Sequence, residues 1–356
     1  MSAGGRRPGR RTACGRVAGG WMGWLAAVLW LLLLLGACDR SPEPAPTRAQ
    51  SASPSRAAPP EPKTAASSEA PRSRLRHPAA ERIVAIGDVH GDLAATRAAL
   101  RLAGAVNQQG DWVGGKLVVV QVGDQIDRGN DDRAILDWFE VLIAQARAAG
   151  GALHVLNGNH EVLNVMGDFR YVWKKTYADF AEFAPSGSLG AMLARYPAEQ
   201  RGRAAAFLPG GVYARRLAQH SVVVIVGDTV FVHGGLLPSH VSYGLEQINE
   251  EISSWMWNAS TRRPSTVTDE RSPFWTRVYS DGDPGAGACG MLEETLAKLR
   301  AARMVVGHTV QEGGISSGCG ERVWRIDVGL AEYYGNRLEV LELSGGRART
   351  LRAPEP

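Results

Sequence analysis

The stretch Ile83-Val84-Ala85-Ile86-Gly87-Asp88-Val89-His90-Gly91 joins a short apolar run to an acid and an imidazole. Four consecutive apolar residues are typical of a strand that is buried on both faces. Glycine lets the backbone turn sharply where the run stops. The stretch therefore predicts Asp88 and His90 at the lip of a sheet, and divalent transition metals accept carboxylate together with imidazole.

The same pattern returns further along the chain. Gly123-Asp124-Gln125-Ile126-Asp127-Arg128-Gly129 follows the apolar run 117–120, and Gly158-Asn159-His160-Glu161 follows the run 153–156. Segments with a helical apolar period, near 93–102 and at 134–148, separate the three runs. Strand, motif and helix in this order indicate an α/β architecture with the active residues at the carboxyl ends of strands.

Two more apolar runs end at histidine. These motifs are His233-Gly234-Gly235 and Gly307-His308-Thr309. Counting all the runs, six polar side chains stand just past predicted strands: Asp88, His90, Asp124, Asn159, His233 and His308. Such a set suits two divalent metals with one bridging acid. A lone residue of this kind usually caps a turn, but six of them at strand ends favour the metal interpretation.

Charge limits the classes of partner. The 356-residue chain has a formal net charge of +4, but residues 1–37 hold five Arg and no acid, and residues 39–80 hold seven basic against four acidic residues. From residue 81 onward the chain has 28 basic and 32 acidic residues. This balance argues against a nucleic-acid partner. The sequence also lacks a CxxC zinc pattern and a glycine-rich P-loop.

Residues 1–38 have the parts of a secretory signal. Five arginines are followed by the uncharged, mostly apolar segment 21–35 and by Leu35-Gly36-Ala37-Cys38. This resembles a bacterial lipoprotein signal, in which Cys38 becomes the lipidated first residue. It predicts an exported, periplasmic protein anchored in a membrane, and Asp39 points to the inner membrane. An uncleaved anchor helix is the alternative interpretation.

The rest of the chain divides into a spacer and a catalytic domain. Residues 39–80 are rich in Pro, Ala, Ser and Arg, which predicts a disordered linker. The catalytic domain is expected at 81–350, with a helical insertion at about 167–219 that either roofs the site or packs as a cap. The stretch 244–272 is polar and precedes a helix near 291–302. Further strands are predicted at 222–226, 230–232, 304–306, 323–328 and 338–343.

The four motifs Gly-Asp-x-His-Gly, Gly-Asp-x-x-Asp-Arg-Gly, Gly-Asn-His-Glu and His-Gly-Gly, in this order, resemble those of the PPP family of metallophosphatases within the calcineurin-like phosphoesterases. Residues 158–164, 167–172 and 272–277 resemble the bacterial Shewanella-like protein phosphatases. The resemblance implies a four-layer αββα sandwich of two mixed sheets. It assigns Asp88, His90 and Asp124 to one metal. Asp124, Asn159, His233 and His308 are assigned to the other.

The same resemblance implies roles for further residues. A hydroxide that bridges the two metals would attack phosphorus directly. His160 would donate a proton to the leaving group, and Asp127 would orient it. Arg128 and Arg277, with Asn159, would bind the phosphate oxygens. The implied metals are two divalent transition ions, with Mn²⁺ favoured and Fe or Zn as alternatives.

We therefore expect a metal-dependent phosphoric monoester hydrolase acting on phosphoserine, phosphothreonine or phosphotyrosine in proteins. A hydrolase of nucleotides or other small phosphate compounds, using the same site, is the second interpretation. A membrane-tethered binding or sensor module that has lost the chemistry is the third. Such a module should have lost ligands or the pair of His160 and Asp127, and the chain retains all of them.

Two cysteines remain once export and lipidation account for Cys14 and Cys38. Cys289 and Cys319 form an even pair, which in an oxidising compartment predicts a disulfide closing the loop around His308. Two unpaired buried thiols are the alternative.

Overall fold

The computed structural model describes residues 75–187, 190–258 and 260–353. The predicted signal 1–38, its Cys38 and Asp39, and the linker up to residue 74 lie outside the described residues. Within the described residues, no helix combines the length and the apolar character that a bilayer crossing requires.

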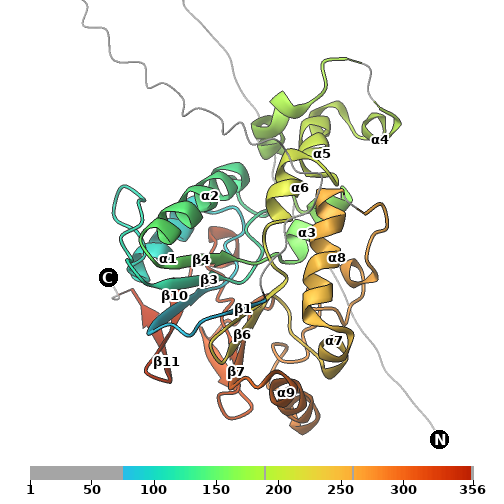
Figure 1. Cartoon of the computed structure of the whole chain (residues 1–356). Coiled ribbons are helices and arrows are strands. Elements are labelled where there is room, and N and C mark those ends of the chain that lie inside the picture. Colours follow the sequence, from blue (N-terminus) through green and yellow to red (C-terminus); the bar gives the residue numbers. More distant parts are fainter. Residues whose placement is uncertain (1–74, 188–189, 259, 354–356) are drawn as a thin grey trace, which may run out of the picture. The chain divides into compact units, whose positions relative to one another are not determined.

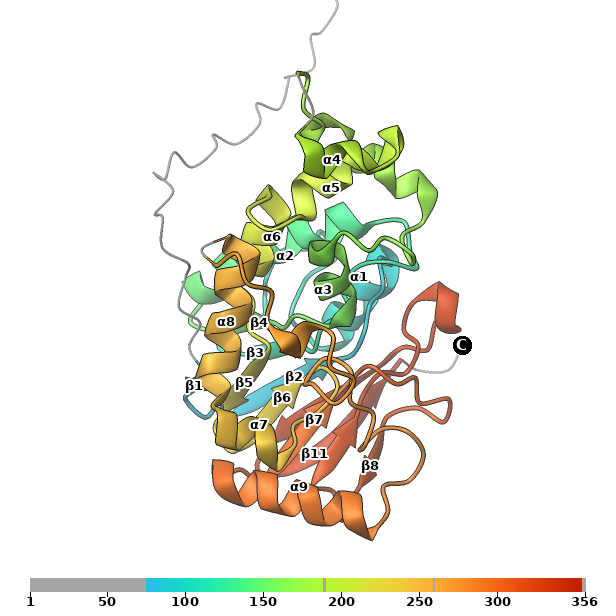
Figure 2. The ribbon, with the colours of Figure 1, turned by 90° about the vertical axis from the view of Figure 1, so that its right-hand side faces the viewer.

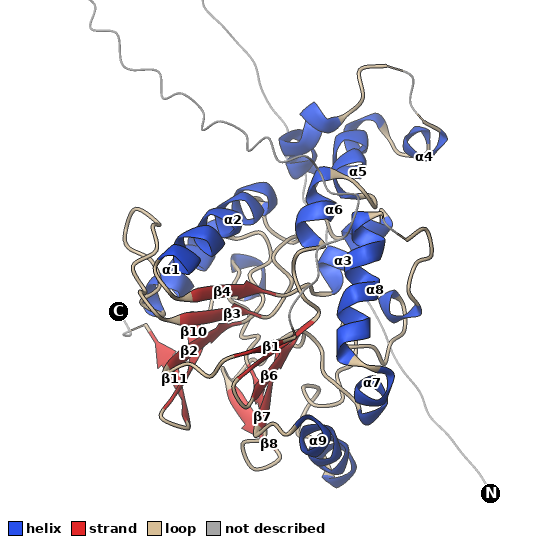
Figure 3. Ribbon diagram, in the orientation of Figure 1, coloured by secondary structure: helices blue, strands red, loops and turns tan. Residues whose placement is uncertain are grey.

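The first sheet has five strands in the order β11-β10-β2-β3-β4. Strands β2, β3 and β4 run parallel, whereas β10 is antiparallel to both β2 and β11. Helices α1 and α2 cover one face of this sheet (Figure 3), and a second sheet packs against the other face. The bounds are β2 (Arg82–Ile86), α1 (Leu93–Leu102), β3 (Val118–Gln121), α2 (Asp132–Ala148), β4 (Ala152–Val155), β10 (Glu339–Ser344) and β11 (Arg347–Arg352).

The second sheet has six strands in the order β1-β5-β6-β7-β9-β8. It is also mixed, because β5 and β6 pair antiparallel while β6, β7 and β9 run parallel. Helices α7, α8 and α9 belong to this half of the fold (Figure 1). The bounds are β1 (Arg76–His77), β5 (Val223–Val226), β6 (Thr229–Val232), α7 (Pro238–Tyr243), α8 (Leu245–Trp257), α9 (Ala286–Leu299), β7 (Arg303–Val306), β8 (Ser316–Gly318) and β9 (Val323–Arg325).

Alternating side chains of the second sheet supply two different cores. Val224, Phe231 and Val305 join Val84 and Val119 of the first sheet in one buried apolar cluster. Their neighbours in sequence face the other way and pack with helices α8 and α9, the contacting set being Val223, Ile225, Val230, Met304, Ile248, Ile252, Leu292 and Leu296. This is the period-2 pattern of a strand between two layers. The architecture is therefore the expected αββα sandwich of two mixed sheets.

A run of short helices lies between β4 and β5, over the predicted insertion 167–219. It stands at one end of the domain in Figures 1 and 2. Its aromatic rings pack on one another, with Phe180, Phe207 and Tyr213 at centroid distances of 5.2–5.4 Å. The elements are α3 (Asn159–Met166), which precedes the insertion, then η1 (Lys174–Phe183), α4 (Ala191–Ala194), η2 (Ala198–Gln200), α5 (Arg201–Phe207) and α6 (Val212–Leu217).

Three boundaries differ from the prediction. The predicted linker 39–80 overlaps the fold, because β1 pairs with β5 and the Ile225 N–H donates to the carbonyl of Leu75. Backbone pairing does not require an apolar sequence, so composition did not reveal it. At the other end β11 continues past the predicted limit of 350, to Arg352. The polar stretch 244–272 contains helix α8, whose buried Ile248 and Ile252 form a narrow stripe.

Candidate metal and phosphate site

The six predicted ligands come together although they are spread over 220 residues of sequence. Asp88 and His90 follow β2, Asp124 follows β3, and Asn159 begins α3. His233 and His308 follow β6 and β7. All six side chains are at most 7% exposed. The carboxyl ends of neighbouring strands meet at one edge of the sandwich, and this geometry brings the side chains to one place.

The motif backbone is unusually constrained. Non-glycine residues with a left-handed backbone include His90, Asp124, Asp127, Arg128 and His308, with φ between 41° and 69°. Each such residue costs free energy and persists only where its surroundings hold it. Glycine is needed beside them: a Cβ on Gly158 would lie 2.2 Å from Oδ1 of Asp124.

Two groups of possible metal-binding atoms share Asp124. One group is His90, Asp124 and His160, and the other is Asp124, His233 and His308; within each group the ligand atoms lie within 4.8 Å of one another. Oδ2 of Asp124 is 3.4 Å from Nε2 of His233 and 3.7 Å from Nε2 of His90. This places Asp124 where a bridging ligand would stand.

The second group also includes the predicted amide ligand. Nε2 of His233 lies 2.9 Å from Oδ1 of Asn159 and 3.1 Å from Nδ1 of His308. Three donor atoms of different chemistry therefore converge on one point with Asp124.

The outer nitrogens of the three histidines face backbone carbonyls. Nδ1 of His90 is 3.3 Å from the Ile126 carbonyl, Nδ1 of His233 is 3.0 Å from that of Val122, and Nε2 of His308 is 3.2 Å from that of Trp275. An N–H on each outer nitrogen would donate to its carbonyl, which leaves a lone pair on the inner nitrogen. Burial, and then the charge of His160, lowers the pKa of His90 to about 3, so its ring is neutral at pH 7.

Asp88 lies at the margin of both groups. Its carboxylate is 3.9 Å from Nε2 of His90 and accepts the backbone N–H of His308 at 3.1 Å. Burial, and then the charges of Asp327 and Asp124, raises the pKa of Asp88 well above its usual range. A buried group of mutually repelling carboxylates is what a bound cation would relieve.

The donor set therefore fits divalent metal ions. Imidazole nitrogens, carboxylates and an amide oxygen point inward from a rigid, buried frame. Nε2 of His160 also faces Asp124, at 3.8 Å, but the other nitrogen of this ring is paired with Asp127, so we count His160 as a neighbour of the metal-binding atoms and not as a ligand.

His160 and Asp127 form a close pair beside the metal-binding atoms. Nδ1 of His160 lies 2.7 Å from Oδ2 of Asp127, and both residues are buried. Burial alone would lower the pKa of His160, but the Asp124 charge and the Asp127 hydrogen bond outweigh it and raise the pKa to about 9. A protonated imidazole beside the metal groups can serve as a general acid.

The two predicted phosphate-binding arginines differ in their surroundings. The guanidinium of Arg128 lies over the Tyr171 ring at 4.1 Å, and its Nη1 donates to the Tyr333 hydroxyl at 2.9 Å. Arg277 is tied to the loop after β7, since its Nη1 donates to the carbonyl of His308 and to Oγ1 of Thr309, both at 2.7 Å. Both arginines therefore use Nη1, but Arg128 is held by two tyrosines, whereas Arg277 braces a ligand loop.

Tyrosines form a rim around this site. The Tyr171 ring lies 5.1 Å from that of His160, and the Tyr334 ring lies 5.0 Å from that of His90. Tyr333 and Tyr334 belong to the short helix η4 (Glu332–Tyr334), and Tyr333 is 50% exposed. The sequence analysis assigned no role to these residues.

Sequence reasoning also missed several buried polar residues. Glu161 accepts the backbone N–H groups of Gly158, Asp124 and Gln125 at 2.7–2.9 Å, which ties two motifs together. Asp327 lies beside Asp88. It follows strand β9, but Arg325 interrupts the apolar residues there and no glycine precedes Asp327, so the signal that revealed the other acids was incomplete for it. Arg203 and Asn164 contact Asp127 from helices α5 and α3, and no local pattern marks them.

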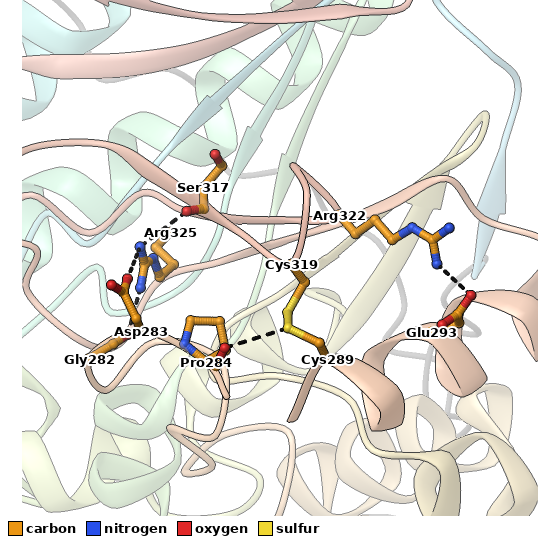
Figure 4. Close-up of a disulfide and its surroundings, with 9 residues drawn as sticks. All are labelled: Gly282, Asp283, Pro284, Cys289, Glu293, Ser317, Cys319, Arg322 and Arg325. Atoms are coloured by element: carbon orange, nitrogen blue, oxygen red, sulfur yellow. Dashed lines mark hydrogen bonds and ion pairs between the residues drawn. A yellow bond between two sulfur atoms is a disulfide. The ribbon is translucent and has the colours of Figure 1, made fainter. Parts of the chain in front are cut away.

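Cys289 and Cys319 are joined by a disulfide with a Cα–Cα distance of 5.3 Å. It links the first turn of α9 to the residue after β8, as Figure 4 shows. The closed loop contains His308. Beside it, Arg325 donates to the carbonyls of Gly282 and Ser317, which holds the neighbouring loop against β8 and β9.

A sequence model of the calcineurin-like phosphoesterases matches residues 81–312. This span is more than half of the chain and includes every predicted metal ligand. The protein belongs to the calcineurin-like phosphoesterase family, and it is a phosphoester hydrolase that uses divalent metal ions.

Within that family the chain is similar to Shewanella-like protein phosphatases. Shewanella-like protein phosphatase 2 of Arabidopsis thaliana is 39% identical over 74% of this chain and 75% of that protein. Shewanella-like protein phosphatase 1 of Plasmodium berghei is 27% identical over 70% of this chain and 67% of that protein. The crystal structure of a cold-active protein-tyrosine phosphatase from a Shewanella species superposes with a TM-score of 0.61 at 23% identity, over 79% of this chain and 83% of that one. That likeness concerns the fold.

Proposed function

We propose that this protein is a dinuclear-metal phosphomonoesterase that dephosphorylates proteins, with phosphotyrosine as the favoured residue. The observation that carries the proposal is the position of Asp124 between His90 on one side and His233 on the other, with the His160–Asp127 pair beside it. Such a site could bind a phosphate, with an activated water on one side of the phosphorus atom and a proton donor for the leaving oxygen on the other.

Each residue of the site then has a definite role in the reaction. When bound, two divalent cations activate a water molecule and screen the charge of the phosphate. His160 holds a proton on Nε2 for the leaving oxygen, and Asp127 keeps its ring oriented. Arg128 places a guanidinium beside the site for the non-bridging phosphate oxygens, and Asn159 contributes its amide. Imidazole, carboxylate and amide donors suit Mn²⁺, with Fe and Zn as the other candidates.

The tyrosine rim supports an aryl phosphate. Tyr171 and Tyr334 place flat aromatic surfaces against the two histidines at the mouth of the site, and aromatic rings pack well on one another. The structurally similar Shewanella protein is a protein-tyrosine phosphatase by name, which agrees with this choice. A nucleotide or another small phosphate compound is the competing substrate for the same site.

Full-length protein loaded with Mn²⁺ tests the proposal against panels of phosphotyrosyl and phosphoseryl peptides, a dinucleoside polyphosphate and bis-p-nitrophenyl phosphate. We expect the highest kcat/KM on phosphotyrosyl peptides and little hydrolysis of the diester. Preferred hydrolysis of the dinucleotide would support the nucleotide alternative. Absence of turnover on every ester would leave only the binding-module interpretation.

We further propose that the protein is a periplasmic lipoprotein anchored through Cys38 in the inner membrane. The basic start, the apolar segment 21–35 and the Leu-Gly-Ala-Cys sequence support this. The bond between Cys289 and Cys319 agrees with an oxidising compartment. Mass spectrometry of the mature N-terminus should find a lipid on Cys38, and a Cys38→Ser variant should retain an uncleaved signal. An unmodified Cys38 inside an intact leader would favour the anchor helix.

A further inference from the structure

Arg203 is the largest fully buried side chain of the described residues. It lies on helix α5 of the insertion, not on a motif, and the guanidinium carbon lies 5.0 and 4.8 Å from the centroids of the Phe180 and Phe207 rings. A buried guanidinium needs partners for its donors, because desolvation of an unpaired charge is costly. The partners of Arg203 lead directly to the proton donor.

The first partner is Asp127 itself. Nη2 of Arg203 lies 3.3 Å from Oδ1 of Asp127, while Oδ2 of the same carboxylate accepts from Nδ1 of His160 at 2.7 Å. The second partner is Asp132, whose Oδ2 forms an ion pair with Nη1 at 2.8 Å. Asp132 in turn accepts the backbone N–H of Asp127 at 3.0 Å. Arg203 thus joins two buried carboxylates and fixes both ends of Asp127.

The third partner is Asn164, which closes the network. Nε of Arg203 donates to Oδ1 of Asn164 at 2.8 Å. Arginine can only donate, so the amide oxygen must face it and the amide NH₂ must face the other way. That NH₂ donates to both oxygens of Asp127 at 3.1 Å and to the His160 carbonyl at 2.9 Å. Arg203 therefore also determines which way Asn164 points.

We propose that Arg203 is a positioning residue for the proton donor: through Asp127 and Asn164 it holds the His160 ring where its Nε2 meets the leaving oxygen. The helical insertion then serves the reaction from behind the site, and its role is neither a roof nor a simple cap. The inference rests on the proposed function, because it assumes that His160 protonates the leaving group.

Two esters of the same shape test this role. The phenoxide of phenyl phosphate is a poor leaving group that needs the proton, whereas the p-nitrophenoxide of p-nitrophenyl phosphate leaves readily without it. Loss of general-acid catalysis therefore lowers kcat/KM for phenyl phosphate more than for p-nitrophenyl phosphate. The quantity compared is kcat/KM for phenyl phosphate divided by kcat/KM for p-nitrophenyl phosphate. Both values are measured in one sample, so any unfolded fraction cancels from this ratio. A variant that folds poorly still gives a valid ratio.

The variants are Arg203→Met and Arg203→Lys in the full-length, Mn²⁺-loaded protein, with His160→Asn as the limit. Arg201→Met is the matched control, since Arg201 lies on the same helix and donates to the Tyr196 carbonyl. We expect Arg203→Met to lower the ratio about 10-fold and Arg203→Lys less, because lysine keeps the charge without the fork. Arg201→Met should leave the ratio unchanged.

Equal loss on both esters in Arg203→Met would overturn the inference and leave Arg203 a purely structural ion pair. An unchanged ratio in His160→Asn would overturn it too, because the pair would then not donate the proton. In both cases an active wild-type protein would leave the proposed function standing. A wild-type protein that hydrolyses neither ester would overturn the proposed function, and this inference with it.

Discussion

Nδ1 of His160 lies 2.7 Å from Oδ2 of Asp127, while Nε2 of the same ring lies 3.8 Å from Oδ2 of Asp124. The ring therefore stands between an orienting carboxylate and the acid shared by the two ligand groups. Neither Asp124 nor Asp127 is adjacent to His160 in the sequence. The turns after β3 and β4 bring the three side chains together.

Replacing Asp127 with Asn should disable this pair. An amide can present its NH₂ to Nδ1 and favour the wrong ring tautomer. We expect kcat on phosphotyrosyl peptide to fall about 100-fold or more, with KM little changed. Steady-state kinetics check this, and Asp131→Asn, at the half-buried start of α2, is the control. Equal effects of the two variants would contradict the assigned role.

Arg128→Lys should lower kcat/KM about 10- to 100-fold, because lysine cannot place two donors on a phosphate. Arg277→Lys should have a smaller effect on phosphate affinity, since Nη1 of Arg277 is committed to His308 and Thr309. Competition by inorganic phosphate measures the affinity separately from turnover. If Arg277→Lys weakened phosphate binding more than Arg128→Lys, the order of roles proposed here would be reversed.

Asp124→Asn should change metal content as well as activity. Because Asp124 belongs to both ligand groups, its loss should reduce bound Mn²⁺ from about two ions per chain to about one or fewer. Elemental analysis after gel filtration gives the stoichiometry without an activity assay. An unaltered metal content would show that Asp124 bridges nothing.

The disulfide should contribute to stability. It closes a loop between residues 30 apart, and the chain-entropy relation gives about 3–4 kcal/mol for a loop of this length. Denaturant unfolding of a Cys289→Ser/Cys319→Ser variant should reveal a loss of this order. Wild-type protein unfolded with and without a reductant is the second arm, and coincident transitions would argue against the bond in solution.

His154 should make stability depend on pH. Burial, and then the neighbouring His77, lowers the pKa of His154 from 6.5 to about 4. A lowered folded pKa gives stability that is complete above the unfolded pKa and is lost as the pH falls towards the folded value. We expect the free energy of unfolding to drop between pH 6.5 and 4 by up to about 3 kcal/mol more than in His154→Phe. Parallel curves for the two proteins would refute this.

Much of the site could be predicted because its residues lie next to their own strands. Asp88, Asp124, Asn159, His233 and His308 each follow an apolar run, and a run of that kind carries its own structural signal. Asp327 follows strand β9, in which Arg325 interrupts the apolar residues, so the pattern did not reveal it. The functional neighbours that no local pattern marks are those that reach the site across the fold.

Helix α8 and strand β1 illustrate the limit for the fold. The buried apolar residues of α8 are spaced along one helix face among polar neighbours, and the set is Leu245, Ile248, Ile252, Trp255 and Met256. Strand β1 forms because β5 offers an edge with free backbone groups, and its own composition resembles a linker. Both elements depend on a partner that is distant in the chain.

The sequence by itself determined the α/β class and the residues that could bind metal, because strand pattern and turn glycines are local properties. The four-layer αββα arrangement followed from the resemblance of the motifs to a known family. Only the tertiary structure decided that Arg128 rests on Tyr171 and Tyr333 and that Arg203 supports Asp127 from another helix. Arg128 is 43 residues from Tyr171 and 205 residues from Tyr333 in the sequence, and Arg203 is 76 residues from Asp127. Chain distance hides them, and packing alone creates them.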